Sequence, residues 1–207
     1  MWAFLLFLIK TGLAIDHPRG RPFGQARGAL VLPPNRSLMI TFLDIIEQNP
    51  DALNNVTPDS ISVMDFHGTG VSDKLIAALC KVKNLISVRR IDLEDTEITD
   101  KAGSSLASLK NLETINLQST NVKGTTIIDF LRLPKLFAVQ FSSNDLEPRS
   151  FDAVGQLVQV RHLNLARTGF DDAAALKIAK LKNLLRLGVS DNRQFTDKGL
   201  QVLRGLP

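Results

Sequence analysis

The feature of this 207-residue sequence that most constrains its fold is an internal repeat with a period of 24 residues. The stretches NLETINLQSTNV (111–122), KLFAVQFSSNDL (135–146) and QVRHLNLARTGF (159–170) align when the sequence is shifted by that period. Related stretches at 60–71, 87–98 and 183–195 bring the number of copies to six. A near-constant period of this length indicates a solenoid, in which each repeat packs against the next.

Each copy begins with two apolar positions that are separated by one residue, as in a short strand with one buried face. The first position is Met64, Ile91, Ile115, Val139, Leu163 and Leu187; the second is Phe66, Leu93, Leu117, Phe141, Leu165 and Val189. Further along, apolar residues recur three apart, which predicts a short helix whose first core column is Ile76, Gly103, Ile127, Phe151, Ala175 and Leu200. A single copy cannot bury its apolar face alone, so the copies are expected to share one core.

A corner column between strand and helix contains only threonine or asparagine: Thr69, Thr96, Thr120, Asn144, Thr168 and Asn192. The residues on either side vary, which argues against a solvated loop position. These side chains are expected to pair with backbone groups that the tight corner leaves without a partner.

The pattern Leu-x-x-Leu-x-Leu-x-x-Asn/Thr-x-Ile/Leu over residues 60–207 resembles that of leucine-rich repeat proteins. The stretches TEITDKAGSSLASLKNL (96–112) and RQFTDKGLQVLRGL (193–206) look like the Thr-Asp-x-Gly-Leu variety that is frequent in bacterial repeat proteins. This resemblance implies a right-handed α/β horseshoe of about six repeats, with parallel strands on the concave side and helices on the convex side. It also implies non-catalytic binding of another macromolecule.

Two insertions interrupt the period. Three extra residues near 85–88 are expected to bulge where the first two repeats join, and one extra residue at Arg193-Gln194 lengthens the last corner. The sequence stops at RGLP without a segment of different composition, so the strand edge around residues 187–189 is expected to be exposed or paired.

Three segments precede the repeats. Residues 1–15 include an apolar run that resembles a signal peptide or crude membrane anchor, although its positive charge follows the run. Residues 16–36 have the composition of a linker, with four prolines and three glycines. In residues 37–59, Ser37 as N-cap and an apolar face with Leu38 and Phe42 predict a helical cap on the first repeat. A cleaved or anchored start would place the protein outside the cell or in its envelope; otherwise it is cytoplasmic.

Charge and cysteine content exclude several classes of function. The net charge is +4, and all of it lies in residues 1–36, which hold five basic residues and one acidic residue. The repeats are therefore neutral, whereas a nucleic-acid-binding domain is expected to have a basic face on its folded body. The single cysteine, Cys80, cannot form an intrachain disulfide, and its apolar neighbours indicate a buried structural thiol.

The residues that flank the strand core positions must face away from the core, because side chains alternate along a strand. They are expected to form a polar concave face with acidic residues at the first and second repeats, amides between, and basic residues at the fifth and sixth. We predict that this face binds a protein or peptide through Arg90, Asp92, Glu94, Asn116, Gln118, Gln140, His162, Asn164 and Arg186. On this assignment Ile115→Asp is expected to unfold the protein or halve its cooperative melt, whereas Asn116→Asp hardly matters.

The sequence favours no enzyme, no cofactor and no small-molecule substrate. It has no Gly-x-Ser-x-Gly element and no phosphate-binding loop. Asp65, His67, Asp92 and Glu94 are expected to converge, and such a group either binds a divalent cation or forms a solvated acidic rim. The alternatives to partner binding are a scaffold that self-associates and, more remotely, a metal-dependent enzyme. Membrane contact is expected only through residues 1–15.

Overall fold

The computed structural model describes residues 6–10, 22–25, 37–41 and 61–207. Its strands are β1 (Leu6–Lys10), β2 (Pro22–Gln25), β3 (Ser37–Thr41), β4 (Ile61–Asp65), β5 (Arg90–Asp92), β6 (Thr114–Asn116), β7 (Ala138–Gln140), β8 (His162–Asn164) and β9 (Arg186–Gly188). Its helices are α2 (Asp73–Leu79), α3 (Gly103–Leu106), α4 (Ile127–Phe130), α5 (Ser150–Val154), α6 (Asp172–Ile178) and α7 (Asp197–Leu203), with 3₁₀ helices η2 (Lys83–Leu85) and η3 (Asp100–Ala102).

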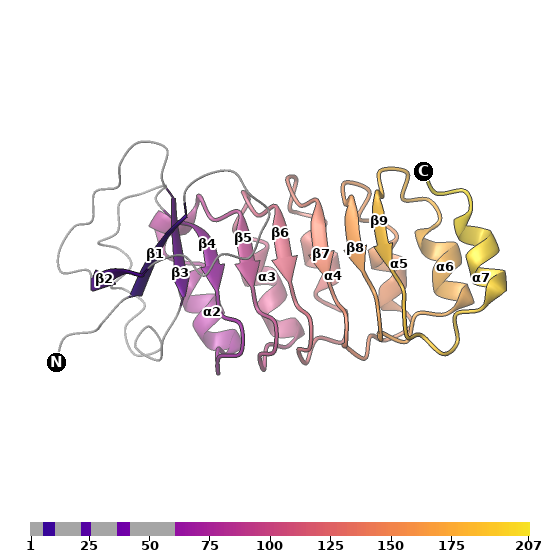
Figure 1. The fold of residues 1–207 in the computed structure, drawn as a ribbon, viewed down its shortest axis with the longest axis horizontal. Helices are drawn as coiled ribbons and strands as arrows, with labels where there is room; N and C mark the ends of the chain where they lie inside the picture. The colour runs from indigo at the N-terminus through magenta and orange to yellow at the C-terminus, as the bar shows by residue number, and fades with distance from the viewer. Residues whose placement is uncertain (1–5, 11–21, 26–36, 42–60) are drawn as a thin grey trace.

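The strands form one sheet in the order β2-β1-β3-β4-β5-β6-β7-β8-β9. From β3 to β9 every pair is parallel and follows chain order, whereas β1 pairs antiparallel with both β2 and β3. Figure 1 shows the strands of the repeats standing in a row, with a row of helices along one face. The expected leucine-rich repeat solenoid is confirmed, with strands and helices at the predicted positions of all six repeats.

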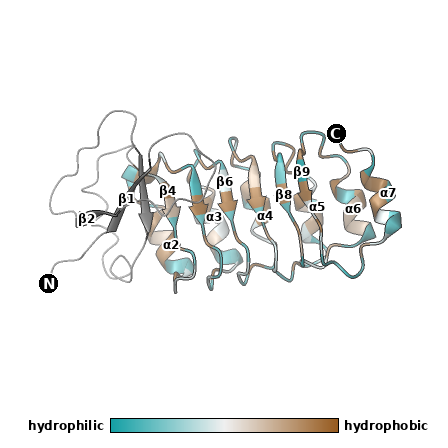
Figure 2. Cartoon of the chain, viewed as in Figure 1, coloured by the Kyte–Doolittle hydropathy of each residue, from teal (hydrophilic) through white to brown (hydrophobic). Residues whose placement is uncertain are grey.

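The core lies between the sheet and the helices and runs through the repeats without interruption. Both strand columns are buried in the inner turns: Ile115 and Leu117 are fully buried, and Leu163 is 2% exposed. Phenylalanines connect successive turns, with ring centroids 5.7 Å apart for Phe151 and Phe170. Burying one such side chain contributes about 1.5–3 kcal/mol, so these contacts stabilise one turn against the next. Figure 2 shows hydrophobic and hydrophilic residues side by side along the same strands and helices.

The last turn is less well covered than the inner ones. Leu187 and Val189 are only half-buried, and Leu200, which the repeat pattern places in the core, is 53% exposed. No following turn packs on α7 and β9 in the described chain, which explains this departure from the predicted core column. The strand edge at residues 187–189 is therefore exposed.

The corners after the strands have the same backbone conformation in every repeat. The residue before the corner column is in the left-handed region, with φ of 65° at Gly68 and φ from 52° to 59° at Asp95, Ser119, Ser143, Arg167 and Asp191. This conformation costs an L-amino acid about 1–2 kcal/mol, and it turns the chain from the strand toward the helix side.

The predicted corner ladder of threonine and asparagine is confirmed, and its two residue types differ in role. Each threonine hydroxyl donates to the carbonyl three residues earlier, as Thr120 does to Leu117 at 3.0 Å. Each asparagine spans two turns: Asn144 donates to the same Leu117 carbonyl at 2.6 Å and accepts from the Thr120 N–H at 2.7 Å. Asn192 makes the same two contacts two turns further along: it donates to the Leu165 carbonyl and accepts from the Thr168 N–H. The corners are thus cross-linked along the solenoid.

The segment before the repeats differs from the sequence prediction. Residues 37–41 form strand β3 and not the start of a helix, because they pair with β1 on one side and with β4 on the other. The remainder of the predicted cap, 42–59, lies outside the described residues. The predicted linker contains strand β2, which pairs with β1. The predicted segment boundaries, and the signal or anchor role of residues 1–15, remain predictions.

The three-residue insertion near 85–88 lies at the end of a 3₁₀ turn, η2. Leu85 and Val88 are both fully buried, so the extra residues add contacts to the core while Ile86 remains 57% exposed. None of the helices in the described part of the chain is long and apolar enough to cross a membrane.

Candidate functional site

Strand register brings the predicted partner-binding residues into straight columns on the inner face of the sheet. One column runs from Val63 through Arg90, Thr114, Ala138 and His162 to Arg186, and the next from Asp65 through Asp92, Asn116, Gln140 and Asn164 to Gly188. Glu94 and Gln118 follow directly after β5 and β6. All nine predicted residues therefore lie on one face, and their role in binding stays a prediction.

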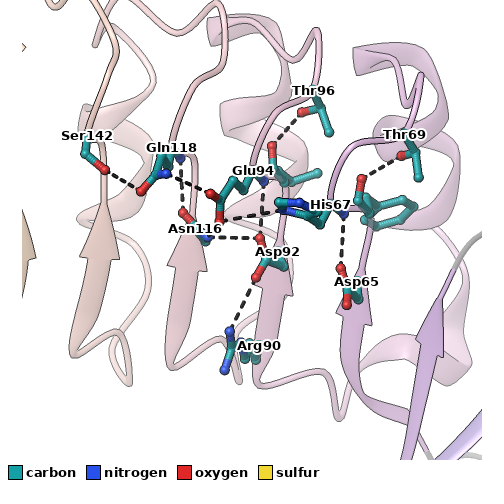
Figure 3. Close-up of polar contacts among 12 residues, drawn as sticks. Asp65, His67, Thr69, Arg90, Asp92, Glu94, Thr96, Asn116, Gln118 and Ser142 are labelled. Atoms are coloured by element: carbon teal, nitrogen blue, oxygen red, sulfur yellow. Dashed lines mark hydrogen bonds and ion pairs between the residues drawn. The ribbon is translucent and has the colours of Figure 1, made fainter. Parts of the chain in front are cut away.

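Hydrogen bonds connect the middle of this face across three repeats (Figure 3). The amide nitrogen of Asn116 donates to Asp92 Oδ1 and to Glu94 Oε2, both at 3.0 Å. Gln118 Nε2 donates to Glu94 Oε1 at 2.7 Å, and Gln118 Oε1 accepts from the Ser142 hydroxyl at 2.7 Å. The amides therefore hold the two carboxylates in one fixed arrangement.

Two cationic or titratable groups flank the carboxylates. Arg90 Nη2 lies 3.3 Å from Asp92 Oδ2, and His67 Nδ1 lies 3.6 Å from Glu94 Oε2. The Asp92 side chain is 13% exposed, whereas the side chain of His67 is 57% exposed. The flanking side chains of His67 and Arg90 are thus the exposed part of this cluster, and the Asp92 carboxylate lies between them.

The middle column also has a structural role that limits what it offers to a ligand. A side-chain oxygen of Asp65, Asp92, Asn116 and Asn164 accepts from the backbone N–H two residues later, at 3.0–3.2 Å. This contact fixes the chain as it leaves the strand. Asn116 is only 3% exposed. Its amide nitrogen donates to Asp92 and Glu94, and its amide oxygen accepts from the Gln118 N–H. It supports the face more than it presents itself to a partner.

The predicted acidic cluster is smaller than the sequence suggested. Ligand atoms of His67, Asp92 and Glu94 lie within 4.8 Å of one another, and Asp65 is not part of this group. Asp65 instead turns back to the N–H of His67. The carboxylates already accept hydrogen bonds from Arg90, Asn116 and Gln118, so the arrangement is that of a hydrogen-bonded acidic rim.

The opposite end of the face is basic and partly aromatic. His162 packs edge-on against Phe137, with ring centroids 6.0 Å apart. Arg186 is exposed, and its side chain makes no hydrogen bond or ion pair with the described residues. The predicted separation of charge along the face is therefore present in the structure: carboxylates at β5 and guanidinium at β9.

Two further ladders were not foreseen from the sequence. On the helix side, Asp73, Asp100 and Asp172 each accept two or three hydrogen bonds from the start of the next helical segment; Asp172, for example, accepts from Thr196 N–H at 2.8 Å. Those contacts, first the Thr196 N–H and then its hydroxyl, lower the pKa of Asp172. The recurring pairs Ser72-Asp73, Thr99-Asp100, Asp171-Asp172 and Thr196-Asp197 were the available signal.

The other unforeseen ladder follows the edge of the sheet where the strands begin. Asn111 and Asn183 donate to the carbonyls of Ile86 and Val158 in the preceding turns, both at 2.8 Å. Next to it lies a surface depression of about 580 Å³ lined by Lys135, Phe137 and Arg161 among others.

Cys80 lies on the helix side, away from these surfaces. Burial raises the pKa of its thiol to about 12, and Ser108 acts weakly in the opposite direction. Cys80 is half-buried and packs against the core, where the sequence predicted a buried thiol.

Comparison with known proteins identifies the fold. No family model and no curated protein sequence matches the chain. Among solved structures, an internalin (inlF) from Listeria monocytogenes has 15% identity and a TM-score of 0.54 over 87% of this chain and 59% of its own. An internalin C2 from the same species has 20% identity and a TM-score of 0.50, over 72% of this chain and 70% of its own. The chain thus spans less than two thirds of the first of these. At such identities the likeness establishes the leucine-rich repeat fold alone.

Proposed function

We propose that this protein binds another protein or a peptide, without catalysis, through the inner face of its sheet and the adjacent corners. The observation that carries the proposal is the ordered polar network from His67 to Ser142, which spans four turns. A face of fixed donors and acceptors loses little conformational entropy when a partner docks, because its side chains are already positioned. The separation of negative and positive charge along the face adds orientation to that docking.

A steric variant tests the proposal without disturbing the network. Ala138 lies on the inner face in the middle of the sheet, and Ala173 lies exposed on helix α6. Ala138→Arg adds a long side chain where a partner would dock, whereas Ala173→Arg adds the same side chain on the opposite surface. Both variants are expected to keep the fold.

The measurement is crosslinking in the native source followed by mass spectrometry of the captured proteins. Proteins captured by the wild type are expected to be retained by Ala173→Arg and lost by Ala138→Arg. An identical set of captured proteins for both variants would rule out the inner face as the binding surface.

A second candidate, self-association, is favoured by the exposed end of the solenoid. Leu187 and Val189 are half-buried, Leu200 is 53% exposed, and the outer edge of β9 has no strand beside it in the described chain. Light scattering over a range of protein concentrations tests this candidate. Mass that increases with concentration and is reduced in Leu200→Lys supports it, and a monomer at every concentration rejects it.

A further inference from the structure

A band of exposed and half-buried residues lies where the strands begin, outside the inner face. Glu113, Phe137, Arg161 and Leu185 each precede a strand, and we refer to these four residues as the entry band. They are neighbours on successive turns, because the N–H of each donates to the carbonyl of the one before at 2.7–3.0 Å. Glu113, Phe137 and Arg161 of this band line the 580 Å³ depression.

The entry band combines exposed apolar side chains with a fixed aromatic ring. Phe137 is 37% exposed, Leu185 67%, and the nearby Val158 58%. The edge-on contact with His162 holds the Phe137 ring in place. Aromatic and arginine side chains are the residues that most often contribute binding energy at protein interfaces.

The charge beside these apolar residues is positive and uncompensated. Arg161 and the adjacent Arg186 are exposed, and neither side chain has a hydrogen bond or ion pair within the described residues. Arg89 lies 3.7 Å from Glu113 and neutralises the one carboxylate of the band. The surface therefore offers two guanidinium groups, without a carboxylate of their own, next to apolar side chains.

We infer that the entry band binds a peptide segment of another protein that carries carboxylates beside an aliphatic or aromatic side chain. The inference rests on the proposed function and specifies its partner. Unpaired guanidiniums form strong, often bidentate contacts with carboxylates, and Phe137, Val158 and Leu185 need an apolar counterpart. A nucleic-acid strand would satisfy the guanidiniums but leave Val158 and Leu185 against charged phosphates.

Surface area supports this placement. Five strand spacings of ~4.8 Å and a width of four residues at ~3.3 Å give the inner face roughly 320 Å². A typical protein partner covers about 800 Å² on each side. A neighbouring surface has to contribute contact area to such an interface. The entry band adjoins the inner face at Phe137 and His162.

The test is selection of a phage-displayed library of random dodecapeptides on the immobilised full-length protein, followed by affinity measurements on the enriched peptides. We expect enriched peptides to carry at least two Asp or Glu residues beside an apolar one. Charge reversal, Arg161→Glu, is expected to weaken their binding at least about tenfold, since two like charges at contact distance cost more than about 1.4 kcal/mol at an effective dielectric constant near 20. Phe137→Ala is expected to weaken it as well.

Arg204→Glu is the matched control, because Arg204 is exposed and unpaired within the described residues but lies after helix α7. It is expected to leave peptide affinity unchanged. Arg161→Gln serves as a milder variant if the charge reversal lowers the melting temperature.

The outcomes separate this inference from the proposed function. Peptides whose binding is lost in Ala138→Arg but kept in Arg161→Glu would overturn the entry band and support the inner face. Basic peptides, no enrichment, or Arg161-dependent binding of an oligothymidylate probe would each overturn the inference. Loss of acidic-apolar peptides in Arg161→Glu, with retention in Arg204→Glu, would establish it.

Discussion

Replacing Asn116 by aspartate is expected to destabilise the solenoid strongly at neutral pH. The Asn116 amide donates to Asp92 and Glu94 at 3.0 Å, so Asn116→Asp removes both hydrogen bonds and brings a third carboxylate against two others. Hydrogen bonds to charged groups contribute about 1.5–3 kcal/mol each. Two like charges ~4 Å apart repel by about 1 kcal/mol in water and about 4 kcal/mol at an effective dielectric constant of ~20.

The loss of hydrogen bonds and the charge repulsion do not add in full. The new carboxyl can take up a proton, and Arg90 beside Asp92 offsets part of the repulsion. We therefore expect a loss of about 2–4 kcal/mol in the free energy of unfolding at pH 7, near the upper end for single substitutions. Repulsion raises the pKa of the new carboxyl in the folded state above its unfolded value. Such a group is most destabilising when it is ionised, so the deficit should shrink as the pH falls toward 4.

The assay is denaturant unfolding followed by far-UV circular dichroism at pH 4 and pH 7. Asn164→Asp is the matched control: Asn164 occupies the same column, accepts from the Ala166 N–H at 3.1 Å, and has only Ser142 as a side-chain partner, at 3.4 Å. It should cost less than about 1 kcal/mol. Equal losses for the two variants, or a loss for Asn116→Asp that does not change with pH, would refute the reasoning.

Three further predictions concern the corners, the thiol and the helix starts. Ser143 has φ of 59°, so Ser143→Gly is expected to raise the free energy of unfolding by about 0.5–1 kcal/mol and Ser143→Val to lower it, in the same unfolding assay. The Cys80 pKa of about 12 against an ordinary 9.0 predicts alkylation by iodoacetamide at pH 8 about a thousandfold slower in the folded than in the unfolded chain; comparable rates would show an accessible thiol. Because the Asp172 pKa is lowered in the folded state, its contribution to stability is present above its ordinary pKa of 3.8 and is lost as the pH falls below it. Asp172→Asn should therefore lower stability at pH 7 and weaken its acid dependence in unfolding curves measured from pH 2 to pH 7, and an unchanged dependence would contradict that assignment.

The repeat period made the inner face predictable in detail. Because each turn is built alike, aligning Ile91, Ile115 and Val139 in the sequence gave the register of the strands, and neighbouring residues could be assigned to the outside by alternation. The corner threonines and asparagines were recognisable for the same reason: their column stayed polar while its surroundings changed.

The segment at Ser37–Thr41 could not be assigned in this way. Its apolar residues fit a helical face, but strand pairing with residues 6–10 and 61–65 determines its structure. Such pairing depends on contacts far apart in sequence, which local spacing does not contain. The role of Asn116 was missed for a related reason. The alternation of side chains along the strand predicted that Asn116 faces outward. Only the structure shows that its amide nitrogen donates to both Asp92 and Glu94.

The binding role of the inner face is the central claim, and site-specific photocrosslinking tests it most directly. A photoreactive amino acid placed at Thr114, in the inner column, or at Ala173, on the outer surface of α6, would report which surface another protein touches in the native source. We predict protein adducts from position 114 and none above background from position 173. Adducts from position 173 alone, or in equal yield from both, would contradict the account.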